Sequence, residues 1–382
     1  MFKKVYFDNA ATTAVREEVV EAMAKSLMED FGNPSSTHGF GRSSKSIVEQ
    51  ARKDIAKVLN AHSSEIIFTS GGTEADNLVL KSAVKDMGVE HIISTGIEHH
   101  AVVHTLDELE HQGLVRVHNL NLNSKGEPDL NQLEDLLKSL EGKVLISLMH
   151  VNNEIGNLLD IDRVTSLSTQ YGALFHSDTV QSVGHFQWDL QKQKVDFLAV
   201  SAHKFHGPKG VGFAYIRKGH PIKALISGGS QEKGMRAGTE SIHNIVGLAK
   251  ALQLTQENYH QERSYIEGIK RYFIETLSRE IPSVVFNGTS ADFEKSTYTM
   301  VNVSIPIVNE KASLLLFNLD LKGIACSKGS ACQSGSQKGS HVLSQILDEK
   351  ALEFPALRFS FSKYNTREEV DYVVEVLKEL LG

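Results

Sequence analysis

A lysine flanked by histidines is the clearest chemical signal in the sequence. Lys204 follows the apolar run 195–200 (VDFLAV) and precedes Phe205, although lysine is rarely buried. An apolar setting lowers the pKa of a lysine, and the neutral amine can then form a Schiff base with a carbonyl compound. His203 and His206 could instead bind a metal, but no carboxylate motif completes a ligand set. We therefore predict a Schiff-base lysine at position 204 and no metal site.

Two other apolar runs are followed by residues that could do chemistry, one by an aspartate and the other by two adjacent histidines. Asp178 follows the run 173–176 (ALFH), where a carboxylate can keep a pyridine nitrogen protonated and make the ring an electron sink. His99 and His100 follow the run 91–95 (HIIST), where an imidazole can stack on an aromatic cofactor and move protons. The alternatives are an ordinary helix N-cap for the aspartate and a surface pair for the histidines.

A glycine-rich turn at 70–74 (SGGTE) leads from another apolar run into a helical pattern. Glycines let the backbone approach a ligand, and a helix N-terminus with a threonine hydroxyl favours phosphate, although a plain strand–helix turn would look the same. P-loop and dinucleotide fingerprints are absent. Asn153, after the run 144–149, could hydrogen-bond a ring hydroxyl or shape a turn. The Schiff-base lysine, pyridinium carboxylate, stacking imidazole and phosphate turn together predict pyridoxal phosphate as the cofactor.

These residues all follow short β-rich runs that alternate with helix-like stretches. Such alternation predicts an α/β domain with a mostly parallel sheet of about seven strands. Ligands of such sheets bind at the carboxyl ends of the strands, so we expect the residues above to meet at one edge. The expected strands are 65–69, 91–95, 114–119, 144–149, 173–176, 195–200 and 211–216.

A different pattern begins after the helical stretch 241–280 and predicts a smaller α+β domain. We expect a large cofactor-binding domain at 15–257 and a small domain formed by 1–14 and 258–382. The small domain carries a loop at about 323–340 that is rich in Gly, Ser and Lys. Its expected strands are 284–286, 299–305 and 357–361, and its expected helices are 311–320 and 366–381.

Composition narrows the classes of partner and compartment. Forty basic and 47 acidic residues give a net charge of −7, so we expect no direct nucleic-acid binding and no attraction to an anionic membrane. The N-terminus lacks the apolar region of a secretory signal, and no apolar run approaches the ~20 residues that span a bilayer. Two cysteines, Cys326 and Cys332, cannot form a disulfide framework and suit a reducing cytoplasm.

Further short motifs are spread over nearly the whole chain. They are 6–13 (YFDNAATT), 32–36 (GNPSS), 69–74 (TSGGTE), 151–156 (VNNEIG), 203–204 (HK), 228–232 (GGSQE), 236–239 (RAGT), 329–332 (GSAC) and 357–360 (LRFS). Their types and order resemble the class V aminotransferase family and, within it, the NifS/IscS-type cysteine desulfurases.

The resemblance implies a homodimer of fold type I with pyridoxal phosphate on Lys204. Asp178 would be the partner of the pyridinium nitrogen, and His99 would stack on the ring and handle protons. Asn153 and Gln181 would contact the ring hydroxyl. The phosphate would be held by Gly72, Thr73, Ser201 and His203, with Thr239 reaching in from the other subunit.

The resemblance also implies L-cysteine as the substrate. Arg358 would clamp its carboxylate, a role suited to a bidentate guanidinium, and Asn33 would support that end. Cys332 would take the sulfur as a persulfide, releasing alanine, while Cys326 would be packed and slow to react. The acceptor would be an iron–sulfur scaffold or a protein of tRNA thiolation.

The alternatives are selenocysteine lyase, another class V enzyme, or a sulfur-relay scaffold without activity. An aminotransferase has no use for a cysteine in a mobile loop, so Cys332 favours the desulfurase. A scaffold would not need Lys204, Asp178 and His99.

Overall fold

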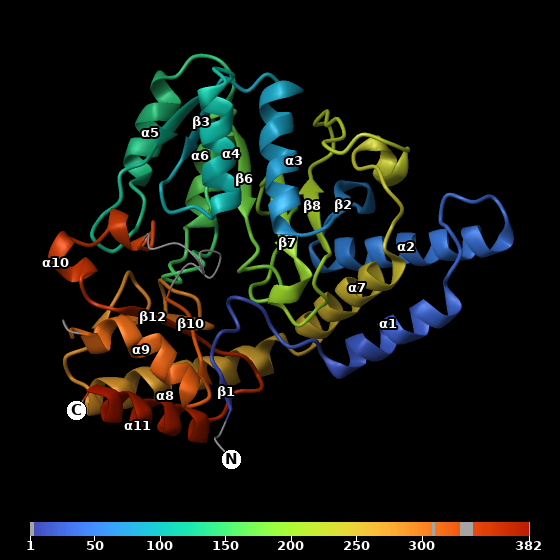
Figure 1. Cartoon of the computed structure of the whole chain (residues 1–382). Coiled ribbons are helices and arrows are strands. Elements are labelled where there is room, and N and C mark those ends of the chain that lie inside the picture. The colour runs from blue at the N-terminus through green and yellow to red at the C-terminus, as the bar shows by residue number, and fades with distance from the viewer. Residues whose placement is uncertain (1–3, 308–309, 329–338, 382) are drawn as a thin grey trace.

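A seven-stranded sheet forms the centre of the larger part of the molecule (Figure 1). The computed structural model describes residues 4–307, 310–328 and 339–381. The strand order is β2-β8-β7-β6-β5-β3-β4, and only β8 runs against the other six. The predicted mostly parallel sheet is therefore confirmed. The strands are β2 (Ile66–Thr69), β3 (His91–Ser94), β4 (Arg116–Asn119), β5 (Val144–Ser147), β6 (Leu174–Asp178), β7 (Phe197–Ser201) and β8 (Gly212–Ile216).

Helices cover both faces of this sheet, because successive side chains of a strand point to opposite faces. Ile66 and Phe68 belong to one hydrophobic core with residues of α2, α5, α6 and α7, whereas Ile67 belongs to a second core with residues of α3 and α4. Within the described residues, no helix is long and apolar enough to cross a membrane. The helices are α1 (Glu17–Glu29), α2 (Gly39–Val58), α3 (Gly72–Lys85), α4 (His100–His111), α5 (Leu130–Ser139), α6 (Ile161–Tyr171) and α7 (Ile242–Glu257).

The C-terminal part packs with the N-terminus around a separate hydrophobic core that contains Phe7, Phe273 and Phe359. An antiparallel sheet, β12-β10-β9, and the pair β1-β11 lie beside α8, α9 and α11 (Figure 1). On the strength of these separate cores we propose the boundaries 15–257 and 1–14 with 258–382 for the two domains. The elements are β1 (Val5–Tyr6), α8 (Tyr259–Glu280), β9 (Val285–Phe286), β10 (Met300–Ser304), α9 (Glu310–Leu321), β11 (Ile324–Ala325), α10 (Glu349–Leu352), β12 (Ala356–Ser360) and α11 (Arg367–Leu381).

Candidate active site

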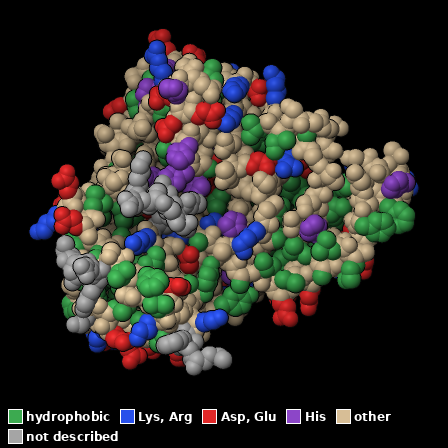
Figure 2. Space-filling view, in the orientation of Figure 1, with side chains coloured by type: hydrophobic (Ala, Val, Ile, Leu, Met, Phe, Trp, Pro, Cys, Tyr) green, Lys and Arg blue, Asp and Glu red, His purple; other side chains and the backbone are tan. Residues whose placement is uncertain are grey.

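A pocket of about 460 Å³ lies at the carboxyl ends of the parallel strands, beside the small domain. Figure 2 shows histidine side chains gathered on this face of the molecule. The loops after β2, β3, β5, β6 and β7 contribute most of the lining, as expected for an open α/β sheet. Ten of the predicted site residues line the pocket: Gly72, Thr73, His99, Asn153, Asp178, Gln181, Ser201, His203, Lys204 and Arg358.

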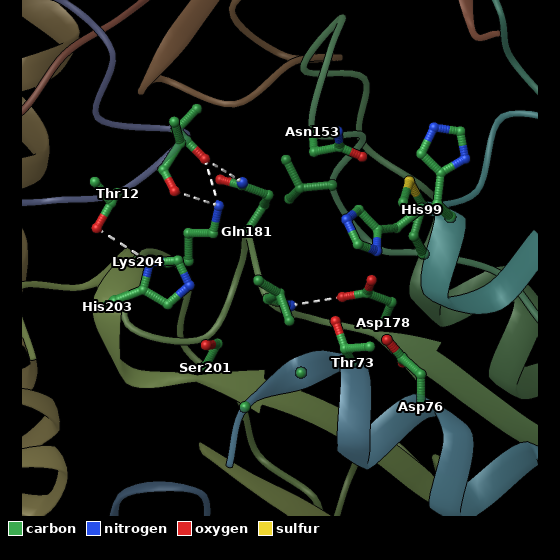
Figure 3. Close-up of a pocket in the computed structure, with 18 of the residues that line it drawn as sticks. Thr12, Thr73, Asp76, His99, Asn153, Asp178, Gln181, Ser201, His203 and Lys204 are labelled. Carbon is green, nitrogen blue, oxygen red and sulfur yellow. Dashed lines mark hydrogen bonds between the residues drawn. The ribbon is translucent and has the colours of Figure 1, made fainter. Parts of the chain in front are cut away.

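Lys204 ends a single 3₁₀ turn, Ala202–Lys204, that directly follows β7. Its Nζ atom donates hydrogen bonds to the carbonyl oxygens of Ala10, at 2.6 Å, and Ala11, at 2.9 Å (Figure 3). The amine therefore points into the pocket, where backbone of the N-terminal segment holds it.

Asp178 is the last residue of β6 and is only 6% exposed. Burial raises the pKa of its carboxyl group to about 6, while the Val180 N–H, at 2.9 Å from Oδ1, and the Lys204 ammonium oppose that rise. Gln181, three residues on, donates from Nε2 to the Ala10 carbonyl at 2.9 Å. The carboxylate and the lysine amine thus belong to one pocket and come from neighbouring strands.

His99 is the N-cap of α4, and its Nδ1 atom accepts the backbone N–H of Ala101 at 3.2 Å. Burial, together with nearby Lys204, His341 and His104, lowers the pKa of its imidazole to about 4. The ring is therefore neutral above pH 4. Because Nδ1 accepts a hydrogen bond, the single proton of the neutral ring lies on Nε2.

The turn before α3 provides a setting for phosphate. Gly72 begins the helix, where backbone N–H groups have no partner within the helix. A Cβ atom at Gly72 would lie 2.4 Å from Cγ2 of Val180, so this position has no room for a side chain. Thr73, Ser201 and His203 line the same pocket. Two hydroxyls, an imidazole and a helix N-terminus can together bind a phosphate group.

Several buried polar atoms of the pocket have no hydrogen bond to any described residue. They include Oδ1 of Asn153, Nε of Arg358 and both carboxylate oxygens of Asp76. Buried polar groups nearly always have a partner, so these atoms indicate that a polar ligand completes the pocket. A ring with a pyridine nitrogen, a hydroxyl and a phosphate group fits this donor and acceptor set.

Asn33 does not lie in the pocket of its own chain. It is exposed in the loop between α1 and α2, where its Oδ1 atom accepts the N–H of Ser35 at 2.9 Å. These two helices carry the loop away from the carboxyl edge of the sheet (Figure 1). Within one chain, the structure therefore does not bring Asn33 to the other predicted site residues.

Thr239 is also outside the pocket, on an exposed part of its segment. The segment is fixed nearby by Glu232, whose carboxylate pairs with Arg52 at 2.7 and 2.8 Å and accepts the N–H of Phe68 at 2.9 Å. Thr239 therefore belongs to an anchored segment but does not line the pocket of its own chain.

Cys332 lies outside the described residues, but the residues that flank its segment are placed. Ser327 exchanges two backbone hydrogen bonds with Arg358, at 3.2 and 2.7 Å. On the other side of the segment, Ser340 donates a hydrogen bond from its hydroxyl to Glu154, and His341 lines the pocket. Both described ends of the segment 329–338 therefore lie at the rim of the pocket.

Sequence reasoning missed Asp76, His341 and the carbonyl groups of Ala10 and Ala11. Asp76 lies three residues after Thr73 on α3, and this spacing places both on one helix face. That spacing was the available signal. Backbone carbonyls give no signal in a sequence, because every residue has one.

The comparisons with known proteins agree with this geometry. The aminotransferase class-V family model matches residues 5–373, and the chain belongs to this family. A protein of Dictyoglomus turgidum named cysteine desulfurase IscS is 41% identical over 383 residues, which cover 100% of this chain and 95% of the relative. Members of the family use pyridoxal phosphate, so the predicted cofactor is confirmed.

Solved structures show the same fold. A NifS-like protein has a TM-score of 0.90 and 37% identity, with 99% of both chains covered. A structure titled SspA in complex with cysteine has a TM-score of 0.80 and 30% identity, and the match covers 95% of this chain and 100% of that one. The predicted fold-type-I architecture is therefore confirmed.

Cys326 provides a prediction about thiol reactivity. Burial raises the pKa of its thiol to about 12, and the Asp8 carboxylate adds to the rise. The thiolate is the reactive form, so only about 10⁻⁴ of the thiol is ionised at pH 8. In a Cys332→Ala variant, we expect iodoacetamide to alkylate Cys326 about a thousandfold more slowly than the same protein unfolded in guanidinium. Mass spectrometry measures both rates, and equal rates would contradict the raised pKa of this half-buried thiol.

Proposed function

We propose that this pocket carries out the cysteine desulfurase reaction, in which L-cysteine gives L-alanine and an enzyme persulfide. The observation that carries the proposal is the meeting of Lys204, Asp178, His99 and Arg358 in one pocket. The full-length relatives named cysteine desulfurase IscS support the same activity. The alternative on this scaffold is selenocysteine lyase, which the variants below distinguish.

Bound pyridoxal phosphate would supply a Schiff-base carbonyl and an electron sink for the substrate's α-carbon. Lys204 would hold the cofactor and move a proton at the α-carbon. Asp178 would keep the ring nitrogen protonated, and neutral His99 would stack on the ring. Asn153 and Gln181 would contact the ring hydroxyl, and the turn at Gly72 would bind phosphate together with Thr73, Ser201 and His203.

Cys332 would take the sulfur from the bound substrate. Its thiolate forms an S–S bond as the C–S bond of cysteine breaks, and the electron pair of the C–S bond stays with the organic fragment, which is protonated to alanine. The flanking residues support this role, because His341 lines the pocket and Ser327 is hydrogen-bonded to the backbone of Arg358, which also lines it. Arg358 would bind the substrate carboxylate, and its unpartnered Nε atom is available for that contact.

We further propose a homodimer in which Thr239 contacts the phosphate of the partner subunit. Apolar side chains of α1 and the loop after it are exposed, including Met28 at 74% and Phe31 at 72%, and Figure 2 shows hydrophobic groups in this region. Such a patch suits contact with a second copy of the chain. This arrangement would also give Asn33, which lies in the same loop, a place near the partner's site.

The sulfur would then pass from Cys332 to a thiol of an acceptor protein, and an iron–sulfur scaffold is the acceptor class we propose. The cytoplasm is the proposed compartment, because persulfide chemistry needs free thiols and the chain has two cysteines. The net charge of −7 supports a protein partner over direct contact with nucleic acid.

The first test locates the cofactor. The purified protein should be yellow, and borohydride reduction should fix the cofactor to the peptide that contains Lys204. Peptide mass spectrometry reads the attachment, and a Lys204→Ala variant should bind the cofactor without covalent capture. A label on another lysine, such as Lys209 at the same pocket, would contradict the assignment.

The second test separates the two cysteines. Cys332→Ala should still bind cysteine but lose nearly all production of alanine and persulfide, whereas Cys326→Ala should keep most of it because its half-buried thiol has a raised pKa. Alanine is quantified by chromatography, and persulfide by mass spectrometry of the intact protein. If Cys332→Ala kept full alanine production, selenocysteine lyase would become the better assignment.

The third test concerns the substrate carboxylate. Arg358→Ala removes a guanidinium that is 2% exposed, and we expect KM for cysteine to rise by about ten- to a hundredfold with a smaller loss of kcat. Arg358→Lys keeps the positive charge but loses the planar guanidinium. Its KM for cysteine should therefore lie between those of the wild type and Arg358→Ala. An unchanged KM in Arg358→Ala would remove Arg358 from the substrate site.

A further inference from the structure

A second carboxylate lies next to Asp178 beneath the pocket. Asp76, on α3, lines the pocket and is 1% exposed. One oxygen of Asp76, one oxygen of Asp178 and one ring nitrogen of His99 all lie within 4.8 Å of one another. Figure 3 shows the two carboxylates close together. Two buried carboxylates this close cannot both be ionised at low cost, so the pair retains one proton near neutral pH.

The hydrogen bonds indicate which of the two holds that proton. Asp178 accepts the N–H of Val180 at 2.9 Å, and the Lys204 ammonium acts on its charge. Neither oxygen of Asp76 accepts a hydrogen bond from any described residue. An ionised carboxylate that is buried needs donors to replace water. The environment therefore stabilises a negative charge on Asp178 and provides nothing comparable for Asp76.

A second histidine, His176 on β6, also lies next to Asp76. Its Nε2 atom lies 3.3 Å from Oδ1 of Asp76, and its Nδ1 atom lies 2.9 Å from the hydroxyl oxygen of Ser147. His176 is fully buried, and burial lowers the pKa of its imidazole to about 3, so the ring is neutral. When Nδ1 donates its proton to Ser147, Nε2 is left as an acceptor facing Asp76.

We propose that Asp76 is a positioning residue that keeps its proton in the holoenzyme, directs it toward Nε2 of His176, and leaves Asp178 as the ionised member of the pair. The inference rests on the cofactor site but not on desulfurase chemistry. Its consequence is that Asp178 faces the ring nitrogen as a single negative charge.

Among the described residues, the titratable groups around Asp76 support this state. Burial raises the pKa of Asp76 well above its usual range, and the charges of Asp178 and Glu98 add to the rise. Burial raises the pKa of Glu98 itself to about 8, although both of its carboxylate oxygens accept the Met149 N–H at 3.0 Å. The imidazole rings of His99 and His176 are neutral near pH 7 and give Asp76 no positive partner.

The first experiment uses the holoenzyme of the variant Asp76→Asn. Asparagine is neutral, as a protonated aspartate is, so the pH midpoint of the cofactor's visible absorbance should match that of the wild type. Asp107→Asn, on the exposed face of α4, is the matched control for a charge change far from the pocket. If Asp76 were ionised, its replacement would remove a negative charge and lower the midpoint by roughly one to two pH units. Such a shift would overturn the proposal.

The second experiment looks for the proton of Asp76 directly in the wild-type protein and uses Asp76→Asn only as a comparison. Wild-type holoenzyme labelled with ¹³C at aspartate carboxyl groups is examined by infrared spectroscopy at pH 8, where Asp178, with its pKa of about 6, is ionised. We expect a carbonyl band of a protonated carboxylic acid that moves with the aspartate label and is missing from Asp76→Asn. Because only aspartate is labelled, a band from a protonated Glu98 would not move with the label. The absence of such a band in the wild type would overturn the proposal. The borohydride test of Lys204 reports separately on the cofactor site.

Discussion

The site depends on a short stretch of N-terminal backbone that ties the two hydrophobic cores together. The carbonyl oxygens of Ala10 and Ala11 hold the Lys204 amine, and the hydroxyl of Thr13 donates to the carbonyl of His203 at 2.8 Å. On the opposite side, the N–H of Ala10 donates to Oγ of Ser360 in β12 at 2.8 Å. The backbone of one segment therefore contacts both the lysine turn and the small domain, so the position of the lysine and the packing of the two domains are set together.

The same pocket separates charges by giving each group a different set of partners. Lys204 faces two carbonyls, Asp178 accepts a backbone N–H, and His99 accepts one at Nδ1. Burial alone would push all ionisable groups toward neutrality, as it does for His99 and His176. Asp178 is the exception because a donor and a nearby ammonium offset part of the burial cost. A cofactor with a basic ring nitrogen would thus meet a negative charge at that one place.

Much of this arrangement could be predicted from the sequence, because the strands are β-rich runs and the residues after parallel strands must meet at one edge. That rule brought Lys204, Asp178 and His99 together correctly. Strand ends were displaced by one or two residues; β6, for example, continues to Asp178 itself. Asn33 was placed in the site by motif alone, and no periodicity indicates which way a loop between two long helices extends.

The residues that sequence reasoning missed act through features that a sequence does not display. Ala10 and Ala11 contribute backbone oxygens, and Asp76 matters because it lacks the donors that Asp178 has. An unpartnered buried atom is a property of the packed structure, visible only when all neighbours are placed. Motif order could therefore identify the cofactor, but the protonation of the two aspartates required the fold.

The two cysteines show how the backbone assigns different chemistry to the same side chain. Cys326 follows β11, which pairs with β1, and its neighbour Ser327 is hydrogen-bonded to the backbone of Arg358. Its thiol is therefore held among buried groups, where burial raises the pKa to about 12. A nucleophile that receives sulfur and then presents it to a partner needs an accessible thiolate and freedom to move. The pairing that fixes Cys326 does not suit it to this role, which we propose for Cys332; the segment of Cys332 is flanked by Ser327, which is hydrogen-bonded to Arg358, and by His341 of the pocket. The residue that would bind the substrate carboxylate, Arg358 on β12, also holds Ser327 just before that segment through two backbone hydrogen bonds, so the proposed substrate contact and the attachment of the segment come from a single strand.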